Sequence, residues 1–170
     1  MVTDFQKLSM AVGEALQKKS WKLVTAESCT GGFLAQVMTS ITGCSQWFER
    51  GFVTYSRASK EELLGVSAEM IQRDGAVSAE VAQAMAEGAL KHSHANIAVS
   101  ITGFAGPTGG AIGKPIGTVF FGFAFKEAPT QVMHQLFVGD REWVRRQAVQ
   151  FALEGLLLRI TSTNSLRTPH

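Results

Sequence analysis

The sequence has few of the residues that build metal sites or disulfide frameworks. Its two cysteines, Cys29 and Cys44, belong to no C-x-x-C pair and lie near no histidine at ligand spacing, so neither a zinc site nor a disulfide framework is expected. Among four histidines only His92 and His94 are clustered, and residues two apart on a helix do not face each other. We therefore predict no bound metal.

Long apolar runs and an excess of one charge are missing as well. No apolar run approaches the roughly 20 residues of a membrane-spanning helix, and polar residues stand near the N-terminus where a signal peptide would be apolar. The 16 Lys and Arg oppose 14 Asp and Glu, giving a scattered net charge of +2, whereas nucleic-acid surfaces usually form a basic stripe. We expect a cytoplasmic protein that binds neither membranes nor nucleic acid.

Apolar residues are plentiful and occur in short segments. With 170 residues, 45% of them hydrophobic, the chain suits one compact domain, which we assign to residues 1–160, followed by a disordered polar tail over 161–170. The strand-like segments are "KLVTA" (22–26), the second half of "WFERGFVTYS", "NIAVSIT" (96–102), "TVFFGFAF" and, after a turn over 126–130, "QVMHQLFVG".

Helical patterns alternate with these segments. We predict helix caps at Thr3, in the capping box "TDFQ", at Ser78 and at Asp140, and a helix "SKEELLGV" that ends near Gly65. The alternation predicts an α/β fold, a three-layer sandwich with a mixed or mostly parallel sheet of about five strands flanked by helices. Its exposed strand edges favour a homo-oligomer, a dimer or larger.

Ligands of open α/β sheets bind beyond the carboxyl ends of strands. Three segments lie there: the turn in "TAESCTGG", the turn after "VTYS", and the glycine-rich loop 103–117, "GFAGPTGGAIGKPIG". We expect them to share one pocket. The loop is no phosphate-binding P-loop, because Thr108 and Pro115 stand where a Gly and a Ser or Thr are needed. It either brings backbone N–H groups close to a ligand or is a flexible connection that binds nothing.

Ser28 stands where a strand turns into a helix. Ser28 or Thr30 can cap that helix while Gly31 and Gly32 allow a tight turn. The same geometry would place a nucleophilic hydroxyl beside free backbone N–H groups that can hold an oxyanion. The nucleophile patterns G-x-S-x-G and S-x-x-K are both absent around Ser28. Local sequence leaves the cap and the nucleophile as alternatives.

A serine nucleophile needs a base, and the three segments contain no histidine. Lys60 can serve if burial removes its proton, since its ordinary pKa is about 10.4; it can equally be a solvated lysine beside Glu61 and Glu62. Cys29 is a rival nucleophile, because a helix N-terminus activates a thiol. Adjacent side chains diverge, so one of Ser28 and Cys29 faces the pocket, and the pattern does not choose between them.

Seven segments in order, "TAESCTGG", "ERGFVTYS", "SKEELLGV", "GAVS", "SITGFAGPTGG", "KPIGTV" and "GDREWVRRQA", resemble the CinA C-terminal-domain family, in particular its stand-alone nicotinamide-nucleotide amidases. The resemblance covers roughly residues 3–160. It implies an α/β domain that hydrolyses the carboxamide of nicotinamide mononucleotide (NMN) to nicotinic acid mononucleotide and ammonia, without a cofactor, in NAD salvage. Full-length CinA proteins have a further N-terminal domain, for which we expect no room in this chain.

The resemblance also implies roles for single residues. Ser28 would be the nucleophile and Lys60 its base, with Tyr55 and Thr102 lining the site. The residues that would bind the substrate are Cys29, Thr30, Gly31 and Gly32 around the oxyanion, Gly103, Gly106, Gly109 and Gly110 of the loop, and Arg141 and Arg145 for the phosphate. Two alternatives stay open: an amidase with Cys29 as nucleophile, and a regulatory module that binds a pyridine nucleotide without turnover.

Overall fold

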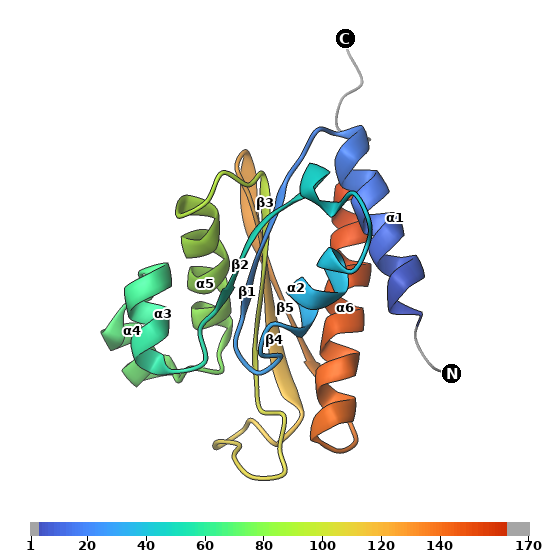
Figure 1. Cartoon of the computed structure of the whole chain (residues 1–170). Helices are drawn as coiled ribbons and strands as arrows, with labels where there is room; N and C mark the ends of the chain where they lie inside the picture. Colours follow the sequence, from blue (N-terminus) through green and yellow to red (C-terminus); the bar gives the residue numbers. More distant parts are fainter. Residues whose placement is uncertain (1–3, 163–170) are drawn as a thin grey trace.

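The structure, a computed structural model, describes residues 4–162 and consists of one five-stranded sheet between two layers of helices (Figure 1). The strands are β1 (Leu23–Glu27), β2 (Phe48–Val53), β3 (Ile97–Gly103), β4 (Thr118–Phe125) and β5 (Ala128–Leu136). They lie in the order β2-β1-β3-β4-β5. β1 pairs in parallel with β2 and β3, whereas β4 pairs antiparallel with β3 and β5. The predicted three-layer α/β sandwich is confirmed, and its sheet is mixed.

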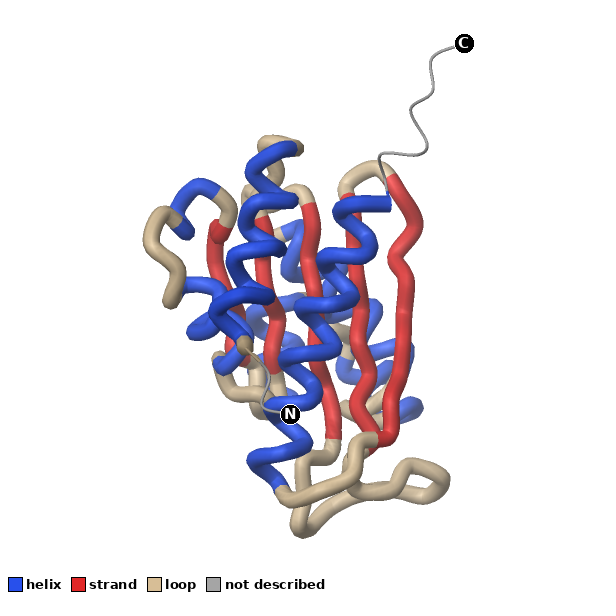
Figure 2. The backbone as a smooth tube through the Cα atoms, turned by 90° about the vertical axis from the view of Figure 1, so that its right-hand side faces the viewer, coloured by secondary structure: helices blue, strands red, loops and turns tan. Residues whose placement is uncertain are grey.

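The helices divide evenly between the faces of the sheet. Helices α1 (Phe5–Lys18), α2 (Phe33–Thr39) and α6 (Arg141–Ser162) cover one face, and α3 (Arg57–Leu64), α4 (Ala68–Asp74) and α5 (Ala79–Lys91) lie on the other. A short 3₁₀ helix, η1 (Cys44–Gln46), precedes β2. In the view of Figure 2, turned by 90°, the strands run side by side behind the long α6. Within residues 4–162, no helix combines the length and apolarity that crossing a bilayer requires.

The sheet separates two apolar cores because successive strand side chains point to opposite faces. Large residues, among them Leu23, Ile97 and Phe121, fill the core under α1, α2 and α6. Smaller ones, such as Val24 and Ala98, face α5. Helix α5 therefore approaches the sheet closely.

Three of the predicted helix ends are confirmed. Ser78 and Asp140 cap α5 and α6 through bonds to the amides of Val81 and Trp143, and Gly65 ends α3. The N-cap of α1, however, is Asp4, one residue after the predicted Thr3.

Other boundaries differ from the predictions. β2 begins at Phe48, in the first half of its segment, and includes only Phe52 and Val53 of the predicted second half. β5 begins three residues early, and α4 has no counterpart among the predicted elements. α6 continues to Ser162, two residues into the predicted tail; the rest of that tail lies outside the described residues.

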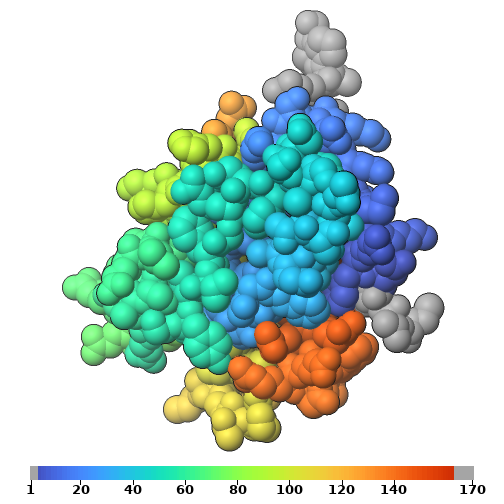
Figure 3. Space-filling model, viewed as in Figure 1, coloured from blue at the N-terminus to red at the C-terminus, as the bar shows by residue number. Residues whose placement is uncertain are grey.

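The sheet brings the three candidate segments to one edge. Since β1, β2 and β3 are parallel, their carboxyl ends meet there, at the lower end of the sheet in Figure 1, and α6 begins at the same end. In the space-filling view of Figure 3, the segment after β1 (blue), the start of α6 (orange) and the glycine loop (yellow) lie next to one another. Segments far apart in sequence can thus form one site.

Candidate active site

The turn after β1, residues 28–32, holds Ser28 in a fixed position; we call it the serine turn. The Ser28 amide donates to the Ile101 carbonyl of β3 (2.9 Å), and the Gly31 amide donates back to the Ser28 carbonyl (3.1 Å). Gly31 and Gly32 have φ of 61° and 99°, a backbone region that favours glycine. The turn is therefore tight, and Ser28 is 9% exposed.

Neither Ser28 nor Thr30 caps α2. The carboxylate of Glu27, fully buried at the end of β1, accepts from the amides of Leu34 (2.8 Å) and Ala35 (3.1 Å) at the start of the helix. The Thr30 hydroxyl also donates to Glu27 (2.6 Å), so its side chain is committed to the carboxylate. Because the Glu27 carboxylate caps α2, the Ser28 hydroxyl is not used in capping the helix.

Lys60 extends from α3 to Ser28, although it is a large charged residue with 1% exposure. Its Nζ lies 2.8 Å from Ser28 Oγ, 2.5 Å from the Thr54 carbonyl oxygen and 3.3 Å from that of Tyr55. Among the ion pairs of residues 4–162, none includes Lys60. Burial without a compensating carboxylate lowers the pKa of Lys60 from 10.5 to about 8.

The hydrogen-bond partners of Lys60 determine the direction of the lone pair of its neutral amine. A neutral amine has two N–H donors and one lone pair, and carbonyl oxygens can only accept. With the two N–H groups directed to the Thr54 and Tyr55 carbonyls, the lone pair faces Ser28 Oγ. Neutral Lys60 is therefore arranged to accept the Ser28 proton.

Cys29 is buried as well, but burial acts on its pKa in the opposite direction. Its side chain is 5% exposed and belongs to the apolar core. Burial, with the nearby Glu27 carboxylate as a second cause, raises the pKa of the Cys29 thiol to about 12. A thiol that stays protonated is a poor nucleophile, so the two adjacent candidates differ clearly in their readiness to react.

A cavity of about 200 Å³ opens in front of the Ser28 hydroxyl. Thr102 lies on its wall, where its hydroxyl donates to the Ala76 carbonyl (2.7 Å). Tyr55 is 62% exposed, and its phenol oxygen accepts from Arg141 Nη2 (3.0 Å). The residues that line the cavity are Ser28, Cys29, Tyr55, Lys60, Ala76, Val77, Thr102, Gly103, Phe104, Ala105, Thr108 and Arg141. All four predicted catalytic residues, Ser28, Tyr55, Lys60 and Thr102, therefore meet in one cavity.

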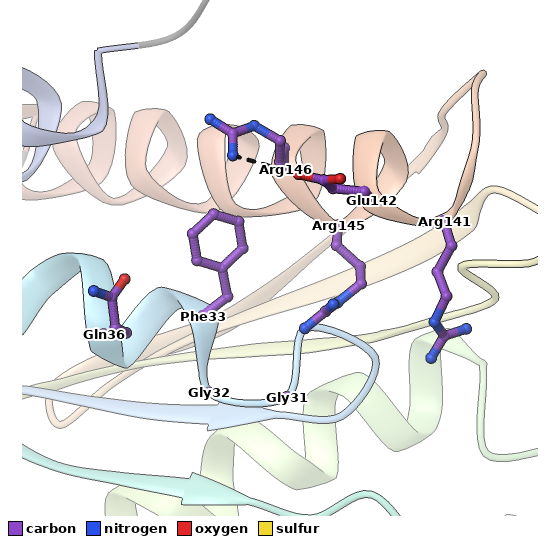
Figure 4. Close-up of a pocket in the computed structure, with 8 residues that line it drawn as sticks. All are labelled: Gly31, Gly32, Phe33, Gln36, Arg141, Glu142, Arg145 and Arg146. Atoms are coloured by element: carbon purple, nitrogen blue, oxygen red, sulfur yellow. Dashed lines mark ion pairs between the residues drawn. The ribbon is translucent and has the colours of Figure 1, made fainter.

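A wider groove of about 630 Å³ lies beside the serine turn, between it and the first turns of α6 (Figure 4). Arg141 borders both the groove and the cavity, and its Nη1 also donates to the Gly106 carbonyl (2.8 Å). Arg145 donates from Nε to the Cys29 carbonyl (3.1 Å) and from Nη2 to the Thr30 carbonyl (3.0 Å). Both predicted phosphate ligands thus also bond the protein backbone.

The glycine loop contributes less than the sequence indicated. Gly103 lines the cavity, and Gly106 reaches the site only through its carbonyl, whereas Gly109 and Gly110 line neither the cavity nor the groove. The loop is tied down by Lys114, whose Nζ donates to the carbonyls of Asp74 and Val77. Only the first part of the loop is placed to meet a ligand.

The sequence interpretation missed two contributions to the site. Glu27 stands in the quoted motif without a predicted role, although a charged residue at the end of an apolar strand is itself a signal. Ala76 and Val77 enter through the segment between α4 and α5; they belong to the quoted segment "GAVS", to which no site role was assigned. In the described part of the chain, no group of three or more His, Cys, Asp or Glu side chains could hold a metal ion.

Comparison with known proteins places this geometry in a family. The CinA C-terminal domain matches residues 5–160. The chain belongs to the CinA C-terminal-domain family. It is 52% identical over 151 residues to nicotinamide-nucleotide amidohydrolase PncC of Enterobacter agglomerans, covering 89% of this chain and 92% of that protein. The protein of the same name from Escherichia coli K12 is 49% identical over 91% of this chain and 93% of its own length.

Solved structures of CinA proteins share the fold. The competence damage-inducible protein A of Klebsiella pneumoniae superposes with a TM-score of 0.90 at 37% identity, over 94% of this chain and 98% of that one. The CinA superfamily protein ECK1530/EC0983 of Escherichia coli gives a TM-score of 0.87 at 37% identity, over 94% of each chain. The resemblance inferred from the seven segments is confirmed.

Proposed function

We propose that the protein is an amidohydrolase that converts NMN and water to nicotinic acid mononucleotide and ammonia, a step of NAD salvage. The observation that carries the proposal is the environment of Lys60, a buried amine whose Nζ lies 2.8 Å from the Ser28 hydroxyl oxygen. The activity in the name of relatives about half identical to this chain supports the same choice of substrate.

The reaction would run through an acyl-enzyme. Lys60 Nζ takes the proton of Ser28 while Oγ forms a bond to the carboxamide carbon, whose electrophilicity the cationic pyridinium ring increases. The protonated lysine then gives its proton to the amide nitrogen, the C–N bond breaks and ammonia leaves. Water, deprotonated in its turn by Lys60, hydrolyses the ester and frees Ser28.

Backbone amides of the serine turn would stabilise the oxyanion. Several amides near the start of α2 are already bonded: Gly31 to the Ser28 carbonyl and Leu34 to Glu27. The amides of Cys29, Thr30 and Gly32 donate to no backbone acceptor within residues 4–162. We assign the oxyanion to the amides of Cys29 and Thr30, the two that follow Ser28 directly in the chain.

Thr102 would distinguish substrate from product. Because its hydroxyl proton is given to the Ala76 carbonyl, the oxygen presents lone pairs to the cavity. A carboxamide NH₂ can donate to those lone pairs, whereas the carboxylate of the product has only acceptors and is repelled. Arg141, at the junction of cavity and groove, is the cation we assign to the phosphate.

The deciding experiment measures ammonia release from nicotinamide, its riboside, NMN and NAD. We expect the highest kcat/KM for NMN, because only a ligand with one terminal phosphate can meet both Ser28 and Arg141 without further bulk. Preference for nicotinamide or the riboside would contradict the phosphate assignment, and ammonia from none of them would reject the proposed function. Tight NMN binding without ammonia over hours would support the regulatory module instead.

The Cys29 alternative has its own test. Alkylation of the native protein would abolish activity if Cys29 were the nucleophile, and a Cys29→Ala variant would be inactive. The pKa of about 12 for the Cys29 thiol leads us to expect slow alkylation and an active Cys29→Ala variant. A homo-oligomer and a cytoplasmic location remain predictions, to be tested by light scattering and by cell fractionation.

A further inference from the structure

Arg145 bonds the backbone of the serine turn from a distant part of the chain. It lies on α6, more than a hundred residues from the turn, and uses two of its N–H groups on two consecutive carbonyls, those of Cys29 and Thr30. Two donors of one planar guanidinium fix the relative orientation of both acceptors. The contact therefore determines more than the position of a single atom.

Each bonded carbonyl also fixes the N–H group of the same peptide unit. These peptide bonds are trans, so each N–H points away from its carbonyl oxygen. The Cys29 carbonyl shares its plane with the Thr30 amide, and the Thr30 carbonyl shares its plane with the Gly31 amide. By turning the two carbonyls toward α6, Arg145 turns both amides away from α6.

The two amides have different tasks. The Gly31 amide closes the turn on the Ser28 carbonyl (3.1 Å), whereas the Thr30 amide donates to no backbone acceptor in the described residues. Gly31 itself imposes little restraint, since glycine permits many backbone conformations. An external bond is needed to hold these peptide planes.

We infer that Arg145 is a positioning residue, which holds the Thr30 amide toward the oxyanion and so serves turnover rather than phosphate binding. The inference rests on the proposed function. It replaces the phosphate role that family resemblance implied for Arg145, and it leaves Arg141, one helical turn earlier on the same side of α6 (Figure 4), as the phosphate ligand.

Arg146 provides a matched control. It is the next residue on the helix and borders the same groove, but its guanidinium stacks over the rings of Phe5 and Phe33 and lies 4.0 Å from Glu142. It carries the same guanidinium group as Arg145 but makes no hydrogen bond to the serine turn in the described structure. Loss of its charge alters the groove without altering the peptide planes.

The test compares Arg145→Lys and Arg145→Met with Arg146→Met in steady-state kinetics on NMN. Since removing one oxyanion donor costs about 100- to 1000-fold in kcat, a displaced donor should cost about 10- to 100-fold. We expect that loss in both Arg145 variants, with KM changed less than about threefold, because a lysine cannot hold both carbonyls. Arg146→Met should keep kcat.

A phosphate ligand would behave differently. It would show as a KM raised about tenfold or more at unchanged kcat in Arg145→Met, largely restored in Arg145→Lys, and that result would overturn the inference.

An NMR measurement decides the question independently of turnover. The ¹⁵N–¹H resonances of Thr30 and Gly31 should shift in both Arg145 variants and stay in place in Arg146→Met. Unchanged resonances in the Arg145 variants would overturn the inference. If the wild-type chain releases no ammonia, the proposed function fails, while these resonances still decide the role of Arg145.

Discussion

The serine turn and the glycine loop occupy similar positions after a strand, but they differ in burial and in the contacts that hold them. Each follows a parallel strand at the same edge of the sheet, the turn after β1 and the loop after β3. In the turn, the Ser28 and Thr30 side chains are buried and the backbone is bonded to β3 and α6. The loop reaches into solvent, where the Ile112 side chain is fully exposed. The proposed nucleophile therefore belongs to the segment that is held by more contacts.

The difference has a physical reason. Catalytic groups must be held within a fraction of an ångström of the productive geometry, and buried, bonded backbone provides that precision. A loop with few buried apolar contacts opens more easily, which suits entry and release of a ligand. We expect changes in the turn to act mainly on kcat and changes in the loop to act mainly on KM.

The largest effect should come from Ser28→Ala. Removing the nucleophile removes the covalent route, and losses of about 10⁴-fold or more in kcat are typical of such enzymes. The measurement is ammonia release from NMN, with binding of NMN by calorimetry as control, because the cavity itself stays intact. Near-normal ammonia release would show that the turn supplies no nucleophile.

Lys60→Met should abolish activity and, unlike most active-site changes, raise stability. The variant replaces a buried amine, which has no ion-pair partner within residues 4–162, by an apolar side chain of similar length. We expect a gain of about 1 kcal/mol near neutral pH, or roughly 2–4 °C in Tm. Because the pKa of Lys60 lies at about 8 in the folded chain and at 10.5 ordinarily, wild-type stability rises between these values. The advantage of the variant should shrink over the same interval.

The pH dependence of turnover is a third test of the same residue. Lys60 is a base only when neutral, so kcat/KM should increase as pH rises through about 8 and level off above it. A profile that is flat between pH values on either side of about 8 would contradict the assignment of Lys60 as base.

The sequence predicted features that depend on neighbouring residues and missed those that depend on packing. Ser78, Asp140 and Gly65 end their helices as expected, because a cap needs only a few adjacent residues. The burial of Lys60 could not be inferred, since "SKEELLGV" is typical of a solvated helix. One distant cause is Gly88 of α5, where a Cβ would lie 2.0 Å from the Leu64 carbonyl oxygen, so only glycine lets α3 sit this close.

The site shows the same limit. Family resemblance brought Ser28, Lys60, Tyr55 and Thr102 together, and the cavity contains all four. Residue chemistry alone left Ser28 and Cys29 as alternatives. Burial lowers the pKa of Lys60 beside Ser28 and raises that of the Cys29 thiol, and this burial arises from elements far apart in sequence. Helix α4 was not predicted because it is seven residues long and buries only Ile71. One buried residue cannot show the helical periodicity of apolar positions.

Glu27→Gln should weaken the turn without removing any reacting group. The new NH₂ would face the amide of Ala35 or the hydroxyl of Thr30, which now donate to the carboxylate. An unsatisfied buried donor costs about 1–3 kcal/mol, so we expect Tm to fall by roughly 2–12 °C and kcat to fall with it. Thermal unfolding measures the first effect. An unchanged Tm would mean that this carboxylate does not hold the turn.

The smallest effects should come from the loop. Lys114→Met removes two bonds that tie the loop to the segment containing Ala76 and Val77, so KM for NMN should rise about three- to tenfold, up to about 1.4 kcal/mol, while kcat changes little. Ile112→Ser, at the exposed tip of the same loop, should leave both constants unchanged. A kcat loss in Lys114→Met as large as that of a turn variant would mean that loop and turn act as one unit, and that the loop closes over the ester while water attacks it.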